Sequence, residues 1–240
     1  MQIIITLKPI GTATLPLNYN YRLQGLIYSL LSGSPAYSAF LHDLGYSTGG
    51  NKFKMFTFGG IKGDCHIENK MLHITGLVSV EIRSISEKFC DIVKKALLSS
   101  GTVRIGSSDF EIRMTEVYDK RIEDAEINII TASPIVARQT TDDGKTVYHA
   151  PDDPVFQDCI NYNYGNKFEA YTGAGPEYGI RIEPSGKIRK VVTNFKGIWI
   201  TAYHGKFHLT GEPLALNFLY QTGLGAKSSQ GFGMFDIIKE

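Results

Sequence analysis

The sequence predicts an α+β protein in which one small unit occurs twice. Segments of alternating apolar and polar residues, typical of strands, are interleaved with segments whose apolar residues recur every three or four positions, typical of helices. In each half of the 240 residues their order is β-α-β-β-α-β. The 13 Tyr, 13 Phe and 25 Gly fit a β-rich protein with many turns. This order defines the ferredoxin-like (RRM-like) βαββαβ unit, so we expect two tandem copies.

The first half begins with a strand over 2–8, where Ile3, Ile5 and Leu7 share one face. A helix over 19–31 follows, because its leucines form one apolar stripe. Ser84-Ile85-Ser86-Glu87 matches a capping box and predicts the start of a helix that ends near Gly101. The other elements expected here are a short helix over 36–43 and strands over 53–58, 65–68, 72–82, 103–105 and 110–118.

The second half follows a charged stretch, Asp119 to Glu126, so we expect domains over 1–120 and 125–240. Asp142-Asp143-Gly144 predicts a hairpin turn. Asp153 before Pro154 predicts a capped helix start, and Pro213 opens a last helix. The strands expected are 127–137, broken by Pro134, then 179–183, 188–194, a long stretch over 196–210, and 234–238.

Composition limits the function classes. The formal net charge is +1, so any nucleic-acid site has to be a local basic patch. Three widely spaced cysteines argue against a disulfide framework and favour a reducing compartment. No basic and apolar leader opens the sequence, and no run approaches 18 apolar residues. We therefore expect a cytoplasmic protein with no membrane partner.

A glycine-rich stretch near the end, residues 223–233, reads GLGAKSSQGFG. A phosphate-binding P-loop needs glycine directly before Lys-Ser, but Ala226 precedes Lys227. A dinucleotide fingerprint needs a third glycine where Ser228 stands. Two interpretations remain: a turn whose N–H groups and Lys227 meet an anion, or a structural turn.

Several motifs together resemble a known family. They are the run from Leu15 to Tyr28 (LPLNYNYRLQGLIY), Phe40-Leu41-His42-Asp43, Lys54 to Phe58 (KMFTF), Ser133-Pro134-Ile135 and the glycine-rich loop. In this order, on a double ferredoxin-like pattern, they are similar to the CRISPR-associated RAMP superfamily. The run from Leu15 to Tyr28 resembles the opening of one branch, the stand-alone endoribonucleases that cut CRISPR repeat RNA.

The resemblance implies a reaction and a site. The family cuts RNA without a metal or cofactor, using the substrate's 2′-hydroxyl as nucleophile and leaving a 2′,3′-cyclic phosphate and a 5′-hydroxyl. By motif, its catalytic tyrosine, histidine and lysine fall on Tyr28, His42 and Lys54. Lys52 competes with Lys54, because residues two apart share a strand face. The partner implied is CRISPR precursor RNA, with effector-complex proteins and a second copy of the chain as further partners.

Each assignment has a bland alternative. His42 can serve as general acid or base because an imidazole titrates near neutral pH, but it can equally be an exposed residue at a helix end. Tyr28 needs a nearby cation to act as a base, and Lys54 would supply that cation and offset charge on the phosphorane. Otherwise Tyr28 flanks a core stripe and Lys54 is a solvated lysine.

RNA contacts are expected at two places. The glycine-rich loop would contribute Gly223, Gly225, Lys227, Ser228, Gly231 and Gly233, unless it only packs the domains together. A predicted hairpin would contribute Lys187, Arg189 and Lys190, unless these are protective charges on an edge strand.

Metal binding is not expected from the sequence. His204 and His208 are four apart, but their surroundings indicate strand, where four residues span about 13 Å. Cys65-His66 has no second pair at ligand spacing.

Two other functions compete with the endoribonuclease. One is an RNA-binding protein of the same fold that has lost cleavage and holds repeat RNA in a larger complex. The other is a double ferredoxin-like protein that serves a small ligand or an assembly, for which the near-neutral charge is the best support.

Overall fold

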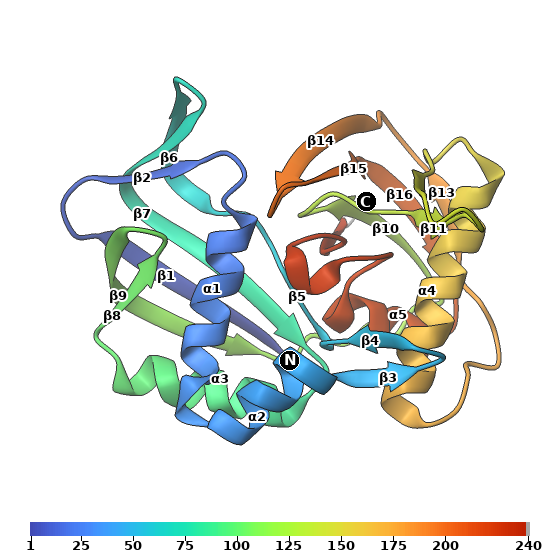
Figure 1. Cartoon of the computed structure of the whole chain (residues 1–240), viewed down its shortest axis with the longest axis horizontal. Coiled ribbons are helices and arrows are strands. Elements are labelled where there is room, and N and C mark those ends of the chain that lie inside the picture. The colour runs from blue at the N-terminus through green and yellow to red at the C-terminus, as the bar shows by residue number, and fades with distance from the viewer. Residues whose placement is uncertain (239–240) are drawn as a thin grey trace.

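The computed structural model describes residues 1–238 and contains two sheets side by side, one from each half of the sequence (Figure 1). Each half has the strand order of a ferredoxin-like unit, which confirms the predicted fold class. All paired strands of the two main sheets are antiparallel. Within the described residues, no helix is both long and apolar enough to cross a membrane.

The first sheet has the order β2-β7-β1-β9-β8, with β5 and β6 also paired to β7. Its strands are β1 (Gln2–Pro9), β2 (Ala13–Pro16), β5 (Phe56–Phe58), β6 (Lys62–Glu68), β7 (Met71–Ser84), β8 (Thr102–Ile105) and β9 (Ser108–Tyr118). Helices α1 (Asn20–Leu30) and α3 (Glu87–Ser99) bury their apolar stripes in the core of this half. Between α1 and β5 lie η1 (Leu31–Gly33), α2 (Pro35–Ala39), η2 (Phe40–Leu44) and the small hairpin β3 (Tyr46–Thr48) and β4 (Asn51–Phe53).

The second sheet has the order β13-β16-β10-β17. Its strands are β10 (Glu126–Thr131), β13 (Arg181–Pro184), β16 (Lys206–Thr210) and β17 (Phe235–Ile238), and its helices are α4 (Pro154–Thr172) and α5 (Pro213–Thr222). Two hairpins stand apart from it: β11 (Arg138–Thr140) with β12 (Thr146–Tyr148), and β14 (Arg189–Phe195) with β15 (Ile198–His204). A short turn, η3 (Ser228–Gln230), lies in the glycine-rich loop. Asp153 caps α4 as predicted, accepting a hydrogen bond from the Val155 N–H.

Two expected strands are divided. The stretch 53–58 breaks into β4 and β5 because Met55 takes a positive φ of +56° and buries its side chain in the second core. The stretch 196–210 breaks at Gly205 into β15 and β16, which belong to different sheets. Alternation alone does not show such breaks, since it continues through a change of sheet.

The predicted capping box was placed two residues early. Ser86, not Ser84, is the N-cap of α3, and its hydroxyl accepts from the Phe89 N–H. Ser84 ends β7 instead, where its hydroxyl donates to the Met55 carbonyl. The strand therefore continues to the edge of the helix.

The joint between the halves is anchored rather than loose. The first sheet ends at Tyr118 and the second begins at Glu126. Between them Ile122 is buried, and its backbone exchanges hydrogen bonds with the side chain of Asn217 on α5. We propose domain boundaries on either side of this segment, at about the expected residues 120 and 125.

The halves also meet along β7 and β17. Arg83 is fully buried and donates to the Phe235 carbonyl and to the Asp236 carboxylate across the junction. Its guanidinium lies 3.9 Å from the centre of the Tyr220 ring. The β3–β4 hairpin of the first half packs against α4 of the second. The junction is therefore a packed interface, which gives it a fixed shape.

Candidate active site

The helical turn η2 presents His42 at the surface. It is a π-type turn in which the Gly45 N–H donates to the Phe40 carbonyl at 2.6 Å. Gly45 has a φ of +64°, and a Cβ there would come within 2.6 Å of the Phe53 carbonyl oxygen. Glycine therefore allows the chain to turn closely past β4 and leaves His42 exposed beside α1.

The three residues expected to be catalytic lie together. The rings of Tyr28 and His42 meet edge-on with centroids 6.1 Å apart. Lys54 donates from Nζ to the backbone carbonyl of His42 at 2.9 Å. Tyr28 comes from α1, His42 from η2 and Lys54 from the segment after β4, so folding gathers a phenol, an imidazole and an ammonium at one place.

Asp43 and Lys52 complete the surroundings of His42. The imidazole Nδ1 lies 2.6 Å from Asp43 Oδ1, and this hydrogen bond lowers the pKa of Asp43. The carboxylate thereby orients the ring, and Nε2, which has no partner among residues 1–238, is the nitrogen that can meet a substrate. Lys52 donates to the Asp43 carbonyl at 2.8 Å. Asp43 has no role in the site predicted from the sequence, although its place directly after His42 is a usable signal.

Tyr28 is half-buried, and burial raises the pKa of its phenol. Within residues 1–238 no cation opposes this shift, so at neutral pH the hydroxyl keeps its proton and can donate a hydrogen bond. Tyr28 and His42 open onto a shallow pocket of ≈ 540 Å³, whose other walls come from η1, α2 and Asp43. The arrangement supports proton transfer at His42 more readily than at Tyr28.

A second cavity, of ≈ 270 Å³, lies between the two halves, and Lys54 is on its wall. We call it the basic cleft. The described residues that line it include no Asp or Glu. They include five basic residues: Lys52, Lys54, Arg138, Lys167 and Lys227. Burial, then the charge of Lys52, lowers the pKa of Lys54; burial, then Arg138, lowers that of Lys227. Unbalanced like charges of this kind favour the binding of an anion.

Lys167 was missed by the sequence analysis. It lies in α4 with a side chain that is 3% exposed, and it donates to the Gly223 carbonyl at 2.7 Å and to the Thr222 carbonyl and Ser228 Oγ at 3.3 Å. Burial lowers its pKa to about 7. No sequence signal marks it, because its partners lie more than fifty residues away.

The glycine-rich loop is built into the junction. All four predicted glycines have positive φ and are buried: Gly223, Gly225, Gly231 and Gly233. Asn20 and Gln24 of α1 donate to the loop carbonyls of Gly231 and Ser229 at 3.0 and 2.7 Å. The glycines therefore give the loop its shape and its close contact with the first half.

Other loop residues face the basic cleft. Lys227 is half-buried, and Ser228, though buried, contributes to the cleft wall with Gly225, Ala226, Ser229 and Gln230. The predicted hairpin residues Lys187, Arg189 and Lys190 are exposed on and just before β14, and they do not line the cleft. The structure thus joins Lys227 to the site around Lys54 and leaves the hairpin as a separate basic surface.

Comparisons with known proteins agree along the whole chain. Residues 14–116 match the family model described as CRISPR-associated protein Cas6, N-terminal, and residues 113–237 match CRISPR associated protein Cas6, C-terminal. The CRISPR-associated endoribonuclease Cas6 1 of Methanocaldococcus jannaschii is 26% identical, over 98% of this chain and 91% of the relative. The CRISPR-associated endoribonuclease Cas6 of Pyrococcus furiosus is 26% identical, over 92% of this chain and 83% of the relative.

Solved structures show the same fold. One described as CRISPR associated protein Cas6 superposes with a TM-score of 0.82 at 26% identity, covering 100% of this chain and 99% of the other. Another, described as an RAMP protein binding different RNA substrates, has a TM-score of 0.86 at 24% identity and full coverage of both chains. With a family model matched over more than half its length, this chain belongs to the CRISPR-associated Cas6 family.

Proposed function

We propose that this protein is an endoribonuclease that cleaves CRISPR precursor RNA within the repeat to give guide RNAs. The observation that carries the proposal is the meeting of Tyr28, His42 and Lys54, of which Lys54 also lines the basic cleft. A phosphodiester placed there would have a proton-transfer group on one side and cationic charge on the other. The two relatives that carry the name endoribonuclease support the same activity.

The proposed reaction uses the RNA's own 2′-hydroxyl. Its oxygen attacks the adjacent phosphorus while the bond from phosphorus to the 5′-oxygen breaks, which leaves a 2′,3′-cyclic phosphate and a 5′-hydroxyl. One proton leaves the 2′-hydroxyl and one is gained by the 5′-oxygen. Nε2 of His42 is the group that exchanges a proton with the substrate, and Asp43 holds the ring in orientation through Nδ1. No step requires a metal ion.

The other two residues have supporting roles in this proposal. Tyr28 keeps its phenolic proton, so it donates a hydrogen bond that positions the RNA rather than acting as the base. Lys54 offsets the negative charge that grows on the phosphorane. Because its Nζ donates to the His42 backbone carbonyl, Lys54 also ties the segment after β4 to η2.

RNA is proposed to run from this site into the basic cleft and onto the β14–β15 hairpin. In the cleft Lys227 and Arg138 meet phosphates, while Gly223, Gly225, Ser228, Gly231 and Gly233 hold the loop in place. Asn163 and Gln230 also line the cleft, and their buried side-chain oxygens have no hydrogen-bond partner among the described residues. Lys187, Arg189 and Lys190 extend the contact at the surface.

Cleavage of an end-labelled repeat RNA in excess EDTA tests the proposal. We expect a single cut by the wild type, a loss of about 10²–10⁴-fold for His42→Ala, and no cut when the sugar at the cleavage point is 2′-deoxy. His208→Ala, in strand β16 outside both cavities, is the matched control and should cut normally. A magnesium requirement, or equal cutting by His42→Ala, would overturn the mechanism. Tight binding without product would instead favour a non-catalytic RNA-binding role.

A further inference from the structure

A cluster of side chains on the β6–β7 hairpin is not used by the proposed reaction. Asn69 and Lys70 form its two-residue turn, and both have positive φ, +49° and +61°. This is the type I′ geometry that matches the twist of a hairpin. The register that follows pairs Glu68 with Met71 and His66 with His73. The turn therefore fixes which side chains face each other.

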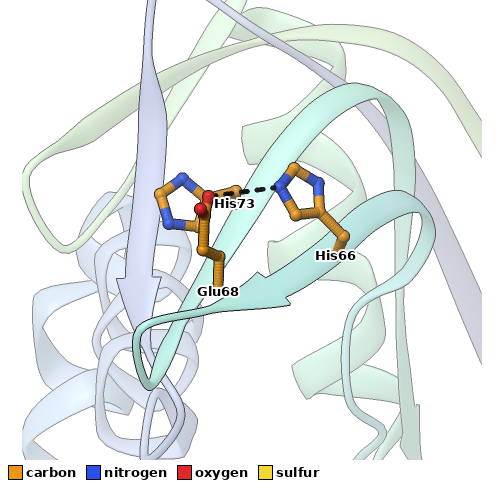
Figure 2. Close-up of side chains that lie close together, drawn as sticks. All are labelled: His66, Glu68 and His73. Atoms are coloured by element: carbon orange, nitrogen blue, oxygen red, sulfur yellow. Dashed lines mark ion pairs between the residues drawn. The ribbon is translucent and has the colours of Figure 1, made fainter.

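Two histidines and a glutamate meet on one face of this hairpin (Figure 2). The rings of His66 and His73 are stacked, with centroids 5.3 Å apart and planes at 15°. Glu68 Oε2 lies 3.9 Å from His66 Nε2. One ligand atom from each residue lies within 4.8 Å of the others. The sequence analysis missed this group because His73 reaches His66 across the strand pair and not along the chain.

The three groups suit a transition-metal ion of the zinc type. Zinc takes imidazole nitrogen at 2.0–2.1 Å and carboxylate oxygen at similar distances, which places tetrahedral ligand atoms about 3.3 Å apart. His66 and Glu68 are exposed, so small side-chain rotations bring the ligand atoms from their present spacing to that distance. Calcium and magnesium fit less well, because they prefer oxygen ligands and two of the three groups here are imidazoles.

We propose that His66, Glu68 and His73 bind one zinc ion, with water completing its coordination. The backbone is already organised for this, because β7 is hydrogen-bonded to β6 on one side and to β2 on the other near His73. Lys8 also lines the surrounding pocket and adds an opposing positive charge. The dissociation constant is therefore on the order of micromolar and not that of a closed structural site.

The zinc site is separate from the proposed cleavage site. Of the residues that the structure describes, none lines both the pocket beside these three side chains and the pocket of Tyr28 and His42. In Figure 1 the β6–β7 hairpin projects from one end of the first half, and α2 lies at the opposite end. Bound zinc would link β6 to β7 across the hairpin and take no part in the chemistry, so the proposal stands whether or not the protein cuts RNA.

Titration of zinc chloride into chelator-stripped protein, followed by calorimetry, tests the site. We expect one equivalent to bind the wild type, at least tenfold weaker binding by His66→Gln and His73→Gln, and a several-fold tightening in Lys8→Gln. His208→Gln is the control: it removes a histidine from a different strand, β16, and should bind zinc as tightly as the wild type does. Saturating zinc should also raise Tm by roughly 5 °C in the wild type and not in the two cluster variants.

Three results would overturn the proposal. The first is that the wild type binds no zinc at concentrations up to about 100 µM. The second is that both cluster variants bind zinc as tightly as the wild type, which would place the ion elsewhere. The third is that zinc binds at half an equivalent and light scattering shows dimers, which would make the ion a bridge between molecules. Circular dichroism of the variants checks that they are folded, and cleavage in EDTA should be the same in His66→Gln and wild type.

Discussion

At the scale of single residues, Lys52 and Lys54 are distinguished by burial. Lys54 is half-buried and bonded to the His42 carbonyl, whereas Lys52 is exposed and bonded to the Asp43 carbonyl. A cation acts more strongly on a nearby charge when water is partly excluded. Burial, then the charge of Lys52, lowers the pKa of Lys54, so Lys54 loses its proton at a lower pH than a free lysine does.

We predict that Lys54→Ala lowers single-turnover cleavage about 100-fold and Lys52→Ala less than about tenfold. Because the pKa of Lys54 is lowered, cleavage should decline on the alkaline side below pH 10.5, the ordinary lysine value. Lys54→Arg keeps its charge and should move that decline to higher pH. Rates measured across this range check both points, and equal losses in the two alanine variants would contradict the assignment.

The sequence was enough to identify the candidate residues but not to decide which of the two lysines is the more important. Tyr28, His42 and Lys54 were predicted from a family resemblance, and the structure places them side by side. The choice between the two lysines depends on burial, and strand alternation does not determine it because β4 ends at Phe53, before Lys54. The pKa of Tyr28 is likewise raised by burial in the folded protein, where its ring packs against Phe56.

At the scale of elements, the glycine-rich loop depends on backbone geometry that other residues adopt only with strain. Gly233 has a φ of +75°, its N–H donates to the Pro134 carbonyl, and a Cβ there would overlap the Leu224 carbonyl oxygen. Gly144 offers a control, since its φ is +79° but nothing lies within 4 Å of the position of a Cβ. The two positions therefore separate backbone strain from a steric clash.

We predict that Gly144→Ala costs about 1 kcal/mol and Gly233→Ala at least about 3 kcal/mol in the free energy of unfolding. Urea denaturation measures both values. Gly233→Ala should also weaken cleavage, because the loop carries Lys227 into the basic cleft. Equal and small losses of stability in the two variants would show that the loop relaxes around the added methyl group.

Lys167 gives the loop a pH-dependent support. Its folded pKa of about 7 lies below the free value of 10.5 because of burial. Between these values the unfolded chain holds a proton that the folded chain has released, so stability from this group rises with pH. Below about pH 7 both states are protonated, and the cost of burying the charge is present in full.

We predict that wild-type protein gains about 2 kcal/mol of stability relative to Lys167→Met between pH 7 and pH 9. The methionine variant removes the titrating group, so it serves as the reference for all other groups that change charge in this range. Urea denaturation of both proteins at the two pH values gives the difference. A constant difference between them would mean that the lysine stays charged when buried.

Elements were predicted well where local pattern alone decides them. The alternation of β1 and the apolar stripe of α1 were read correctly, and so was the cap of α4. The errors came where tertiary contacts intervene: Met55 leaves its strand to reach the second core, and Ser84 bonds to Met55 instead of capping α3. Such choices depend on a partner that is distant in sequence.

At the scale of the whole molecule, the basic cleft exists only because two halves meet. Lys52 and Lys54 come from the first half, whereas Arg138, Lys167 and Lys227 come from the second. The net charge of +1 concealed this concentration of positive charge. Only the packed junction, held by Arg83 between β7 and β17, gives the two groups of cations a common surface.

This arrangement predicts how RNA binding responds to salt. Each phosphate contact to single-stranded RNA contributes about 0.7 to the slope of log K against log salt. If Arg138 and Lys227 each meet one phosphate, replacing both with alanine should reduce the slope by about 1.4.

Exposed Lys88 and Lys95 of α3 line neither cavity, so their double alanine variant should keep the wild-type slope. Filter binding with a 2′-deoxy-blocked repeat RNA measures the three slopes. If all three are equal, the phosphates do not pass through the cleft; a decrease in an Arg189→Ala, Lys190→Ala variant would then place their path on the β14–β15 hairpin.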